Sequence, residues 1–203
     1  MTDVTGAPAG NDTPAPPAND GDPRALATSH RRKFIRGAAV AGVAALAGGV
    51  ALFMNSGTQQ REGAAVLALV LPDVEGRQQA LAQWRGKVLV VNFWATWCGP
   101  CREEMPQFIA VQQRDGMKGV QFVGIAVDQA DKVREFANEI GLNYPALIGG
   151  FGAIELSKAL GNDLAALPFT IVVDRAGKVA HTQLGPLKAI QLDDLLRTLL
   201  APA

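Results

Sequence analysis

The sequence has few of the residues that hold metal ions, because its 203 residues include only two cysteines and two histidines. A closed structural zinc site usually takes four nitrogen or sulfur ligands. His30 lies in an N-terminal basic segment far from the cysteines, so the ligand set is incomplete and we predict no metal site. A c-type haem attachment motif needs histidine directly after the second cysteine. That position is Arg102, which excludes the motif.

The sequence also lacks an excess of either charge. Its 19 lysines and arginines balance 19 aspartates and glutamates, and the bases cluster only over residues 29–36. Binding to DNA or RNA depends on a strongly basic face. We therefore expect no nucleic-acid partner.

The N-terminal third predicts export. Residues 1–28 are rich in Pro, Ala, Gly, Asp and Thr and have no periodic apolar pattern. We therefore expect residues 1–36, which end in the basic cluster, to be a disordered leader. Residues 37–54 carry no charge, and as a helix they would be about 27 Å long, close to the thickness of a bilayer core. Bases before an apolar helix keep the N-terminus in the cytoplasm. We therefore expect a signal or anchor helix at 37–54, a linker at 55–63 and an exported domain at 64–203.

The export route and the fate of the leader have alternatives. The string Arg31-Arg32-Lys33-Phe34-Ile35-Arg36 resembles a twin-arginine export signal, and the weakly hydrophobic run behind it agrees with that. An ordinary Sec-type signal anchor with two arginines is the other interpretation. No clean A-x-A cleavage site follows Met54, which favours an uncleaved anchor over release after cleavage.

Strand and helix patterns alternate along the exported domain. Apolar runs predict strands, and apolar spacings typical of helices predict helices between them. We expect strands over 64–71, 88–94, 120–127, 144–148, 169–173 and 178–184, and helices over 79–84, 101–113, 132–140, 154–160 and 189–200. This order predicts an α/β fold with a mixed central β-sheet flanked by helices.

The two cysteines lie where a predicted strand passes into a predicted helix, in the string Trp97-Cys98-Gly99-Pro100-Cys101. Two thiols at this spacing can open and close as a disulfide, and the start of a helix lowers the pKa of the first thiol. A purely structural disulfide is the alternative. It would close a very short loop, for which the stabilisation is smallest, so a redox role is favoured.

The string from Val91 to Pro106, VNFWATWCGPCREEMP, resembles the thioredoxin fold superfamily, and more narrowly its TlpA/ResA-like branch. These are exported, membrane-tethered thiol-disulfide oxidoreductases of bacteria. The resemblance covers about residues 64–200. It implies a thioredoxin-like fold with an N-terminal extension and a central insertion.

The resemblance also implies roles for residues outside the cysteine pair. Leu167-Pro168 is expected to be a cis peptide facing the cysteines and lining the groove where a substrate strand docks, although a trans proline starting a strand is the alternative. Trp94 and Trp97 are expected to pack and to form groove walls.

Two further positions adjust the chemistry. Glu104 is expected either near the thiols, where it adjusts their pKa, or as an exposed carboxylate in the first turns of the helix. Asn92 stands where thioredoxins carry a buried aspartate, and an amide cannot titrate. The Gly99-Pro100 dipeptide is the one found in reducing thioredoxins.

These residues predict a mechanism. Cys98 is expected to be exposed and to attack a substrate disulfide, and the less exposed Cys101 then resolves the mixed disulfide. No cofactor besides the Cys98–Cys101 pair is expected.

A disulfide reductase in the bacterial periplasm is the favoured function. It would be held at the inner membrane by residues 37–54 or released after cleavage. Expected partners are protein disulfides, with apocytochrome c among the candidates, and a membrane-embedded thiol electron donor. The alternatives are a disulfide oxidase or isomerase on the same fold and a Cu(I)-binding chaperone.

Overall fold

The computed structural model describes residues 57–201 of the chain. The expected disordered segment, basic cluster and apolar helix at 37–54 lie outside these residues. Among the helices of residues 57–201, none has both the length and the apolar character that crossing a membrane requires.

A five-stranded mixed sheet forms the centre of the domain, as predicted. Its strands lie in the order β5-β4-β3-β6-β7. The three strands β3, β4 and β5 run parallel, and β6 and β7 pair antiparallel to their neighbours. The strands are β3 (Val88–Trp94), β4 (Val120–Ala126), β5 (Ala146–Ile148), β6 (Phe169–Val173) and β7 (Val179–Leu184). A small hairpin of β1 (Val70–Pro72) and β2 (Gln78–Ala80) reaches β5 through a bridge between Asp73 and Leu147.

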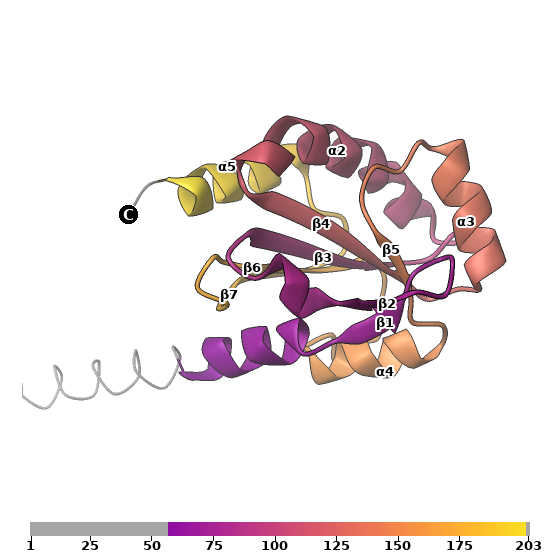
Figure 1. The fold of residues 1–203 in the computed structure, drawn as a ribbon, viewed down its shortest axis with the longest axis horizontal. Coiled ribbons are helices and arrows are strands. Elements are labelled where there is room, and N and C mark those ends of the chain that lie inside the picture. The colour runs from indigo at the N-terminus through magenta and orange to yellow at the C-terminus, as the bar shows by residue number, and fades with distance from the viewer. Residues whose placement is uncertain (1–56, 202–203) are drawn as a thin grey trace, which may run out of the picture. The chain divides into compact units, whose positions relative to one another are not determined.

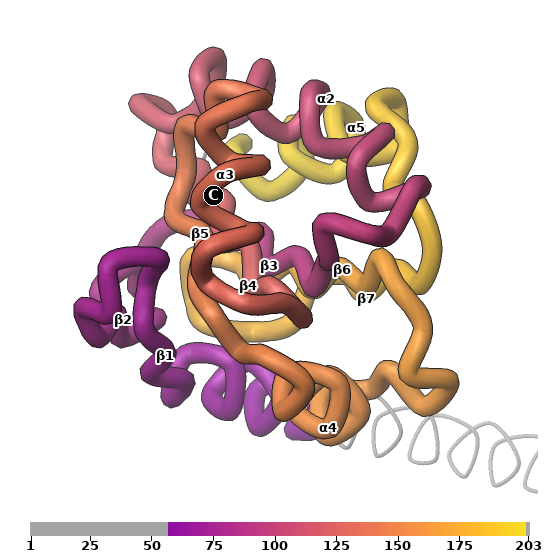
Figure 2. Tube along the Cα trace, turned by 90° about the vertical axis from the view of Figure 1, so that its right-hand side faces the viewer, coloured from indigo at the N-terminus to yellow at the C-terminus, as the bar shows by residue number. Residues whose placement is uncertain are grey.

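Helices cover both faces of the sheet (Figures 1 and 2). On one side lie α2, α3 and α5, and on the other lie α4 and the helical residues 57–67, drawn in indigo. The bounds are α2 (Gly99–Asp115), α3 (Ala130–Glu139), α4 (Gly152–Ala159) and α5 (Ala189–Leu200), with 3-10 turns at Leu81–Trp84 and Gly116–Lys118. With helices on both faces, β3 is buried along its whole length, and all its residues but Asn92 are apolar.

Aromatic contacts hold α2 on the sheet. Phe108 of α2 is fully buried, and its ring centroid lies 5.2 Å from that of Phe122 on β4. The Phe122 ring in turn lies 5.7 Å from the ring of Tyr144, just before β5. The contacts hold α2 against the sheet and set its direction; its first turn carries the cysteines.

The predicted strand over 64–71 is wrong for its first half, because residues 57–67 are helical and β1 begins at Val70. The burial pattern explains the error: Gly63, Val66 and Leu67 are buried while Ala64 and Ala65 are exposed, which is helical spacing hidden in a short apolar run. Gly63 is needed for close approach to the β6–β7 turn, since a Cβ there would lie 2.1 Å from the Gly177 carbonyl oxygen.

The predicted helix over 79–84 is only partly correct. Residues Gln78–Ala80 pair as β2, and a single 3-10 turn follows at Leu81–Trp84.

We predict that Phe108→Ala lowers the free energy of unfolding by about 3–5 kcal/mol, because it leaves a cavity between α2 and β4. Urea unfolding of the full chain measures this. Gln113→Ala, at an exposed position of the same helix, is the matched control and should change stability by less than about 0.5 kcal/mol. A Phe108→Ala loss below about 1 kcal/mol would contradict the packing described here.

Candidate active site

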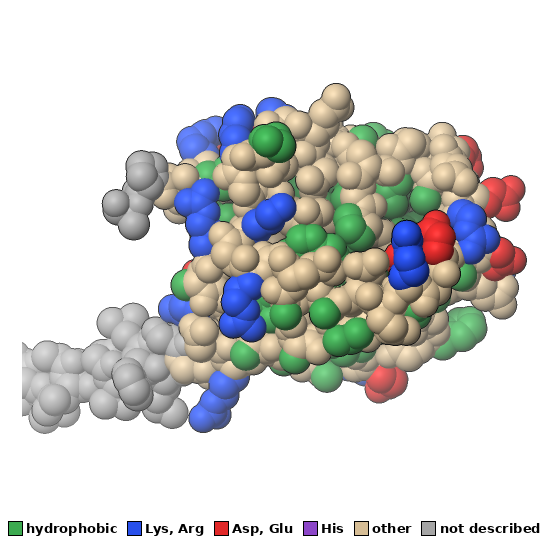
Figure 3. Space-filling view, in the orientation of Figure 1, with side chains coloured by type: hydrophobic (Ala, Val, Ile, Leu, Met, Phe, Trp, Pro, Cys, Tyr) green, Lys and Arg blue, Asp and Glu red, His purple; other side chains and the backbone are tan. Residues whose placement is uncertain are grey.

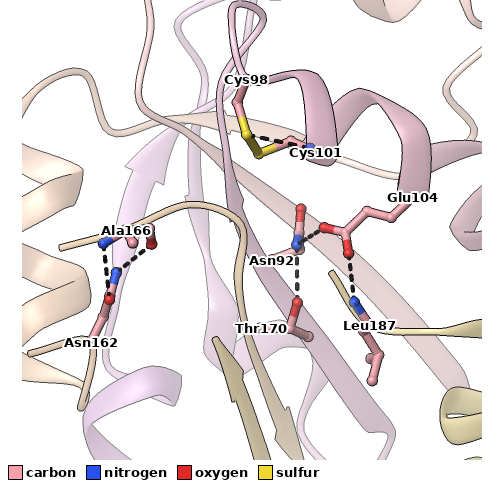
Figure 4. The surroundings of a disulfide bond; sticks show 8 residues. All are labelled: Asn92, Cys98, Cys101, Glu104, Asn162, Ala166, Thr170 and Leu187. Atoms are coloured by element: carbon pink, nitrogen blue, oxygen red, sulfur yellow. Dashed lines mark hydrogen bonds between the residues drawn. A yellow bond between two sulfur atoms is a disulfide. The ribbon is translucent and has the colours of Figure 1, made fainter. Parts of the chain in front are cut away.

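The two cysteines form a disulfide at the start of α2. The two Cα atoms lie 5.3 Å apart, and Cys98 is the N-cap residue of the helix. Its sulfur accepts a hydrogen bond from the backbone N–H of Cys101 at 3.3 Å (Figure 4). The helix N-terminus thus directs a donor and its partial positive charge at the Cys98 sulfur. This favours a thiolate there once the disulfide is reduced.

The two sulfurs differ in their access to solvent. Cys98 keeps 7% of its surface exposed and Cys101 none. Cys98 is therefore the only one of the two that an incoming disulfide can reach, although it is less exposed than the sequence suggested. Beside it, Trp97 is 65% exposed.

The loop before β6 lies in the surroundings of the disulfide (Figure 4). The Leu167–Pro168 peptide is cis, as the resemblance implied. Asn162 holds this loop: its amide nitrogen donates to the Ala166 carbonyl at 2.9 Å, and its oxygen accepts from the Ala166 N–H at 3.2 Å. Asn162 could not be singled out from the sequence, since an isolated asparagine in a loop carries no signal of what it binds.

Glu104 is buried, with 4% of its surface exposed, so the alternative of an ordinary exposed carboxylate is wrong. It lies about one turn beyond Cys101 on the same side of α2. One carboxylate oxygen accepts from Asn92 Nδ2 at 2.9 Å, and the other accepts from the Leu187 backbone N–H at 3.0 Å. The side chain points inward beneath the disulfide (Figure 4).

Asn92 connects Glu104 to the sheet. Its Nδ2 also donates to Thr170 Oγ1 at 3.0 Å, and both side chains are fully buried. The network therefore joins β3, β6, α2 and the segment before α5. Thr170 and Leu187 were missed in the sequence, because they are more than 70 residues away from their partners along the chain and nothing in their local sequence marks them.

Burial raises the pKa of Glu104 from 4.5 to about 7, and the hydrogen bonds from Leu187 and Asn92 offset part of that rise. A carboxyl group with this pKa exchanges its proton near neutral pH. That is the property required of a general acid or base.

A second carboxylate fixes the loop between β3 and the cysteines. The Thr96 hydroxyl donates to one oxygen of Asp128, and the other oxygen accepts from the Gln129 N–H at 2.8 Å. Burial acts to raise the pKa of Asp128, but these hydrogen bonds outweigh it and the pKa is lowered. Asp128 is therefore ionised near neutral pH and orders the entry to α2.

The remaining predicted site residues divide between surface and core. Trp97 is exposed and Leu167 half-buried, so both can contact a bound chain. Trp94 is fully buried with its ring 5.7 Å from that of Phe136, so its expected place in the groove wall is wrong. Trp94 lies on a strand buried on both faces, which leaves its side chain no route to the surface.

Gly99 and Pro100 form the first turn of α2 between the cysteines, and both are exposed.

We predict that Glu104 makes the stability of the protein fall as pH rises. Because its pKa is about 7 in the folded protein and 4.5 ordinarily, the folded state holds the proton more tightly. This stability is fully present below pH 4.5 and is lost as pH rises to about 7. The side chain in Glu104→Gln stays neutral at every pH. The free energy of unfolding of this variant, relative to that of the wild type, should therefore be about 3 kcal/mol higher at pH 8 than at pH 4.

Urea unfolding of the disulfide form at the two pH values measures the difference. Glu103→Gln, an exposed neighbour on α2, is the control and should change stability by less than about 0.5 kcal/mol at either pH. Parallel pH dependences of wild type and Glu104→Gln would disprove the raised pKa.

Comparison with known proteins agrees with this site. The Redoxin family model matches residues 61–199. Thiol-disulfide oxidoreductase ResA of Bacillus thuringiensis (strain Al Hakam) is 32% identical over 130 residues, covering 63% of this chain and 72% of that protein. ResA of Bacillus subtilis (strain 168) is 27% identical over 136 residues, covering 66% of this chain and 74% of that protein.

Solved structures show the same fold. A thiol:disulfide interchange protein of the thioredoxin family from Chlorobium tepidum TLS is similar with a TM-score of 0.60 and 30% identity, covering 66% of this chain and 93% of that one. A DsbF homologue from Corynebacterium diphtheriae has a TM-score of 0.59 and 25% identity, covering 66% and 85%. With its disulfide at a helix start and its mixed sheet, the chain belongs to the Redoxin family, as a ResA/TlpA-like thiol-disulfide oxidoreductase of thioredoxin fold.

Proposed function

We propose that the protein is an exported protein-disulfide reductase in which Cys98 attacks and Cys101 resolves. The observation that carries this is the asymmetry of the disulfide. Cys98 keeps 7% of its surface exposed at a helix N-terminus, whereas Cys101 is fully buried on the side of α2 that carries Glu104. An attacking thiol needs access and a low pKa, and a resolving thiol needs protection from outside disulfides.

The reaction moves two electrons from the protein to its substrate. The Cys98 thiolate attacks one sulfur of a substrate disulfide, and a mixed disulfide forms as the first substrate thiolate leaves and takes up a proton. Cys101 then loses its proton and attacks the Cys98 sulfur. The second substrate thiolate leaves and is protonated, so that the substrate is reduced and the Cys98–Cys101 disulfide is formed.

Glu104 is the proposed acceptor of the Cys101 proton. It lies on the same helix about one turn away, and burial raises its pKa to about 7. A base whose pKa is close to the ambient pH can take up a proton and release it again in each cycle. Asn92 cannot take this role because its amide does not titrate, but it holds Glu104 in place.

The direction of electron flow follows from how weakly the site stabilises a thiolate. A strong oxidant has a stabilised reduced form. Here Pro100 removes one backbone donor from the first turn of α2, and the buried Glu104 places negative charge beneath the sulfurs. Both effects disfavour the thiolate form and favour the disulfide, which makes the dithiol a reductant.

The surface beside the disulfide is the proposed docking place for substrate. Pro168 has no N–H and directly precedes β6, leaving an extended chain segment free to pair next to Leu167. Trp97 supplies an exposed apolar surface beside Cys98. An extended strand of a partner fits this arrangement.

The proposed place of action is outside the cytoplasmic membrane. The basic cluster at 29–36 followed by the uncharged run at 37–54 supports export, by the twin-arginine or the Sec route, and anchoring at the membrane. An exported reductant needs electrons from the cytoplasmic side, so a membrane-embedded thiol donor is the proposed upstream partner. Protein disulfides are the proposed substrates, including those of apocytochrome c before haem attachment.

We predict a reduction potential for the Cys98–Cys101 couple near that of thioredoxin, about −270 mV. Equilibration of the full chain with glutathione or dithiothreitol buffers measures it. Glu104→Gln should raise the potential by about 30 mV at pH 8, because removing the charge favours the thiolate. Glu103→Gln is the control and should leave it unchanged. A value near −120 mV would instead make the protein a disulfide-forming oxidase.

We also predict that Cys101→Ser accumulates mixed disulfides on Cys98 in cells, since the resolving step is lost. Non-reducing electrophoresis followed by identification of the captured proteins measures this. The double variant with Cys98→Ser is the control and should capture nothing. If Cys101→Ser captured no exported protein and the wild type bound Cu(I) tightly, a copper chaperone would replace the reductase as the function.

A further inference from the structure

Three buried polar atoms near the active site have no hydrogen-bond partner within residues 57–201. They are Asn92 Oδ1, Trp94 Nε1 and Tyr144 Oη. Their hydrogen-bonding capacities are complementary: the amide oxygen only accepts, the indole N–H only donates and the hydroxyl does both. Leaving such atoms unpaired in a core is costly, which makes three of them together an observation that needs an explanation.

All three residues are neighbours of one glycine on β4. Asn92 and Trp94 are two residues apart on β3, so they lie on the same face of the sheet. Gly124 on β4 is the register partner of Asn92. A Cβ on Gly124 would lie 2.7 Å from Trp94 Nε1 and 3.6 Å from Tyr144 Cε2. The indole nitrogen and the phenol ring therefore converge on the volume that a side chain at position 124 would occupy.

Packing prevents these groups from turning away. The Trp94 ring lies 5.7 Å from that of Phe136, and the Tyr144 ring lies 5.7 Å from that of Phe122. The Gly124 N–H donates to the Pro145 carbonyl at 2.9 Å, which holds the segment after Tyr144 against the strand. Each of the three polar atoms therefore needs a hydrogen-bond partner at its present position, because its side chain cannot rotate toward another one.

The orientation of Asn92 is set by its other bonds. Its Nδ2 donates to Glu104 and to Thr170, which uses both hydrogens. The oxygen end consequently faces away from Thr170 and toward the disulfide (Figure 4). Burial raises the pKa of Tyr144, and the charge of Glu104 raises it further. Tyr144 is therefore close enough to the network to sense the charge of Glu104.

We propose that Asn92, Trp94 and Tyr144 form a binding site for one internal water molecule over Gly124, which links the Tyr144 hydroxyl to the Asn92–Glu104 network. The water accepts a hydrogen bond from Trp94 Nε1, donates one to Asn92 Oδ1 and forms a third with Tyr144 Oη. Internal waters typically make about three such bonds. A glycine at position 124 is what lets the Trp94 indole nitrogen approach β4 this closely.

The site has a consequence for Glu104. The carboxylate faces Asn92 on β3, Leu187 before α5 and Tyr144 before β5, and Thr170 on β6 lies behind Asn92. Of these groups only Tyr144 titrates, joined by the cysteine thiols after reduction. The charged neighbours on α2, Arg102 and Glu103, are exposed. The hydroxyl, acting through the water and the amide, is thus the group available to stabilise the ionised Glu104.

The test uses the disulfide form of the full chain purified in detergent. A crystal structure should show one water oxygen within hydrogen-bond distance of all three atoms. Tyr144→Phe should remove this water and raise the pKa of Glu104 by roughly 0.5–1. The pKa is measured by ¹³C NMR of the Glu104 carboxyl carbon. Ser157→Ala is the control, because it removes a buried hydroxyl in α4 that bonds Ile154 and Asn162, neither of which belongs to the Asn92–Glu104 network. It should leave the pKa of Glu104 unchanged.

Gly124→Ala is an independent second variant, since its methyl group would lie 2.7 Å from Trp94 Nε1 and would push the indole N–H away from the water without removing a polar atom. It should shift the pKa of Glu104 in the same direction as Tyr144→Phe. Direct contacts among the three groups with no water between them would overturn the site. A shift in Tyr144→Phe no larger than that in Ser157→Ala would overturn the link to Glu104. Neither measurement depends on the direction of electron flow, so the result stands apart from the proposed reductase function.

Discussion

The carboxylate of Glu104 lies in the core beneath a disulfide, held by two donors that come from opposite ends of the domain sequence. Asn92 Nδ2 belongs to the first strand of the central sheet, and the Leu187 N–H precedes the last helix. Each bond requires the parts it joins to be in place, so α2, β3, β6 and the segment before α5 are positioned by one network of three hydrogen bonds. Apolar packing alone would tolerate small slips of α2 along the sheet, but a buried carboxylate with two fixed donors does not, because losing either donor leaves an unpaired acceptor.

The charge of Glu104 also opposes the effect of the helix N-terminus on the two sulfurs. The N-terminus of α2 favours negative charge on Cys98 through its partial positive charge and the Cys101 N–H. Glu104 disfavours charge on the same pair, and more so on Cys101, which is fully buried about one turn away. The two sulfurs are therefore unequal in access and in charge stabilisation. This inequality separates an attacking thiol from a resolving one, and it arises from the positions of the residues on one helix.

The fold was largely predictable, because the apolar runs of β3, β4 and β6 are buried on both faces and have no other stable arrangement. The cysteine pair was predictable for a similar reason, since its spacing is local. What could not be predicted depends on distant partners: Thr170 and Leu187 acquire their roles only through Asn92 and Glu104. Trp94 illustrates a different limit. Its closeness to the cysteines in sequence suggested the groove, but its direction is set by strand alternation and by Phe136 on α3. The helix at 57–67 was missed because two buried residues in a short apolar run fit a strand and a helix equally well.

The asparagine at position 92 explains why a single carboxylate can titrate alone here. An aspartate at the same place would bring a second carboxylate within hydrogen-bond distance of Glu104, since Nδ2 lies 2.9 Å from the Glu104 oxygen. Two buried carboxylates this close cannot both ionise, and their protons would be shared between two coupled steps. With an amide in place, the network has one carboxyl group, and its pKa is governed by burial and by the neutral donors around it. The chain thus differs from thioredoxins in the position of its buried acid: the residue on the strand is neutral, and the carboxylate comes from the helix that carries the cysteines.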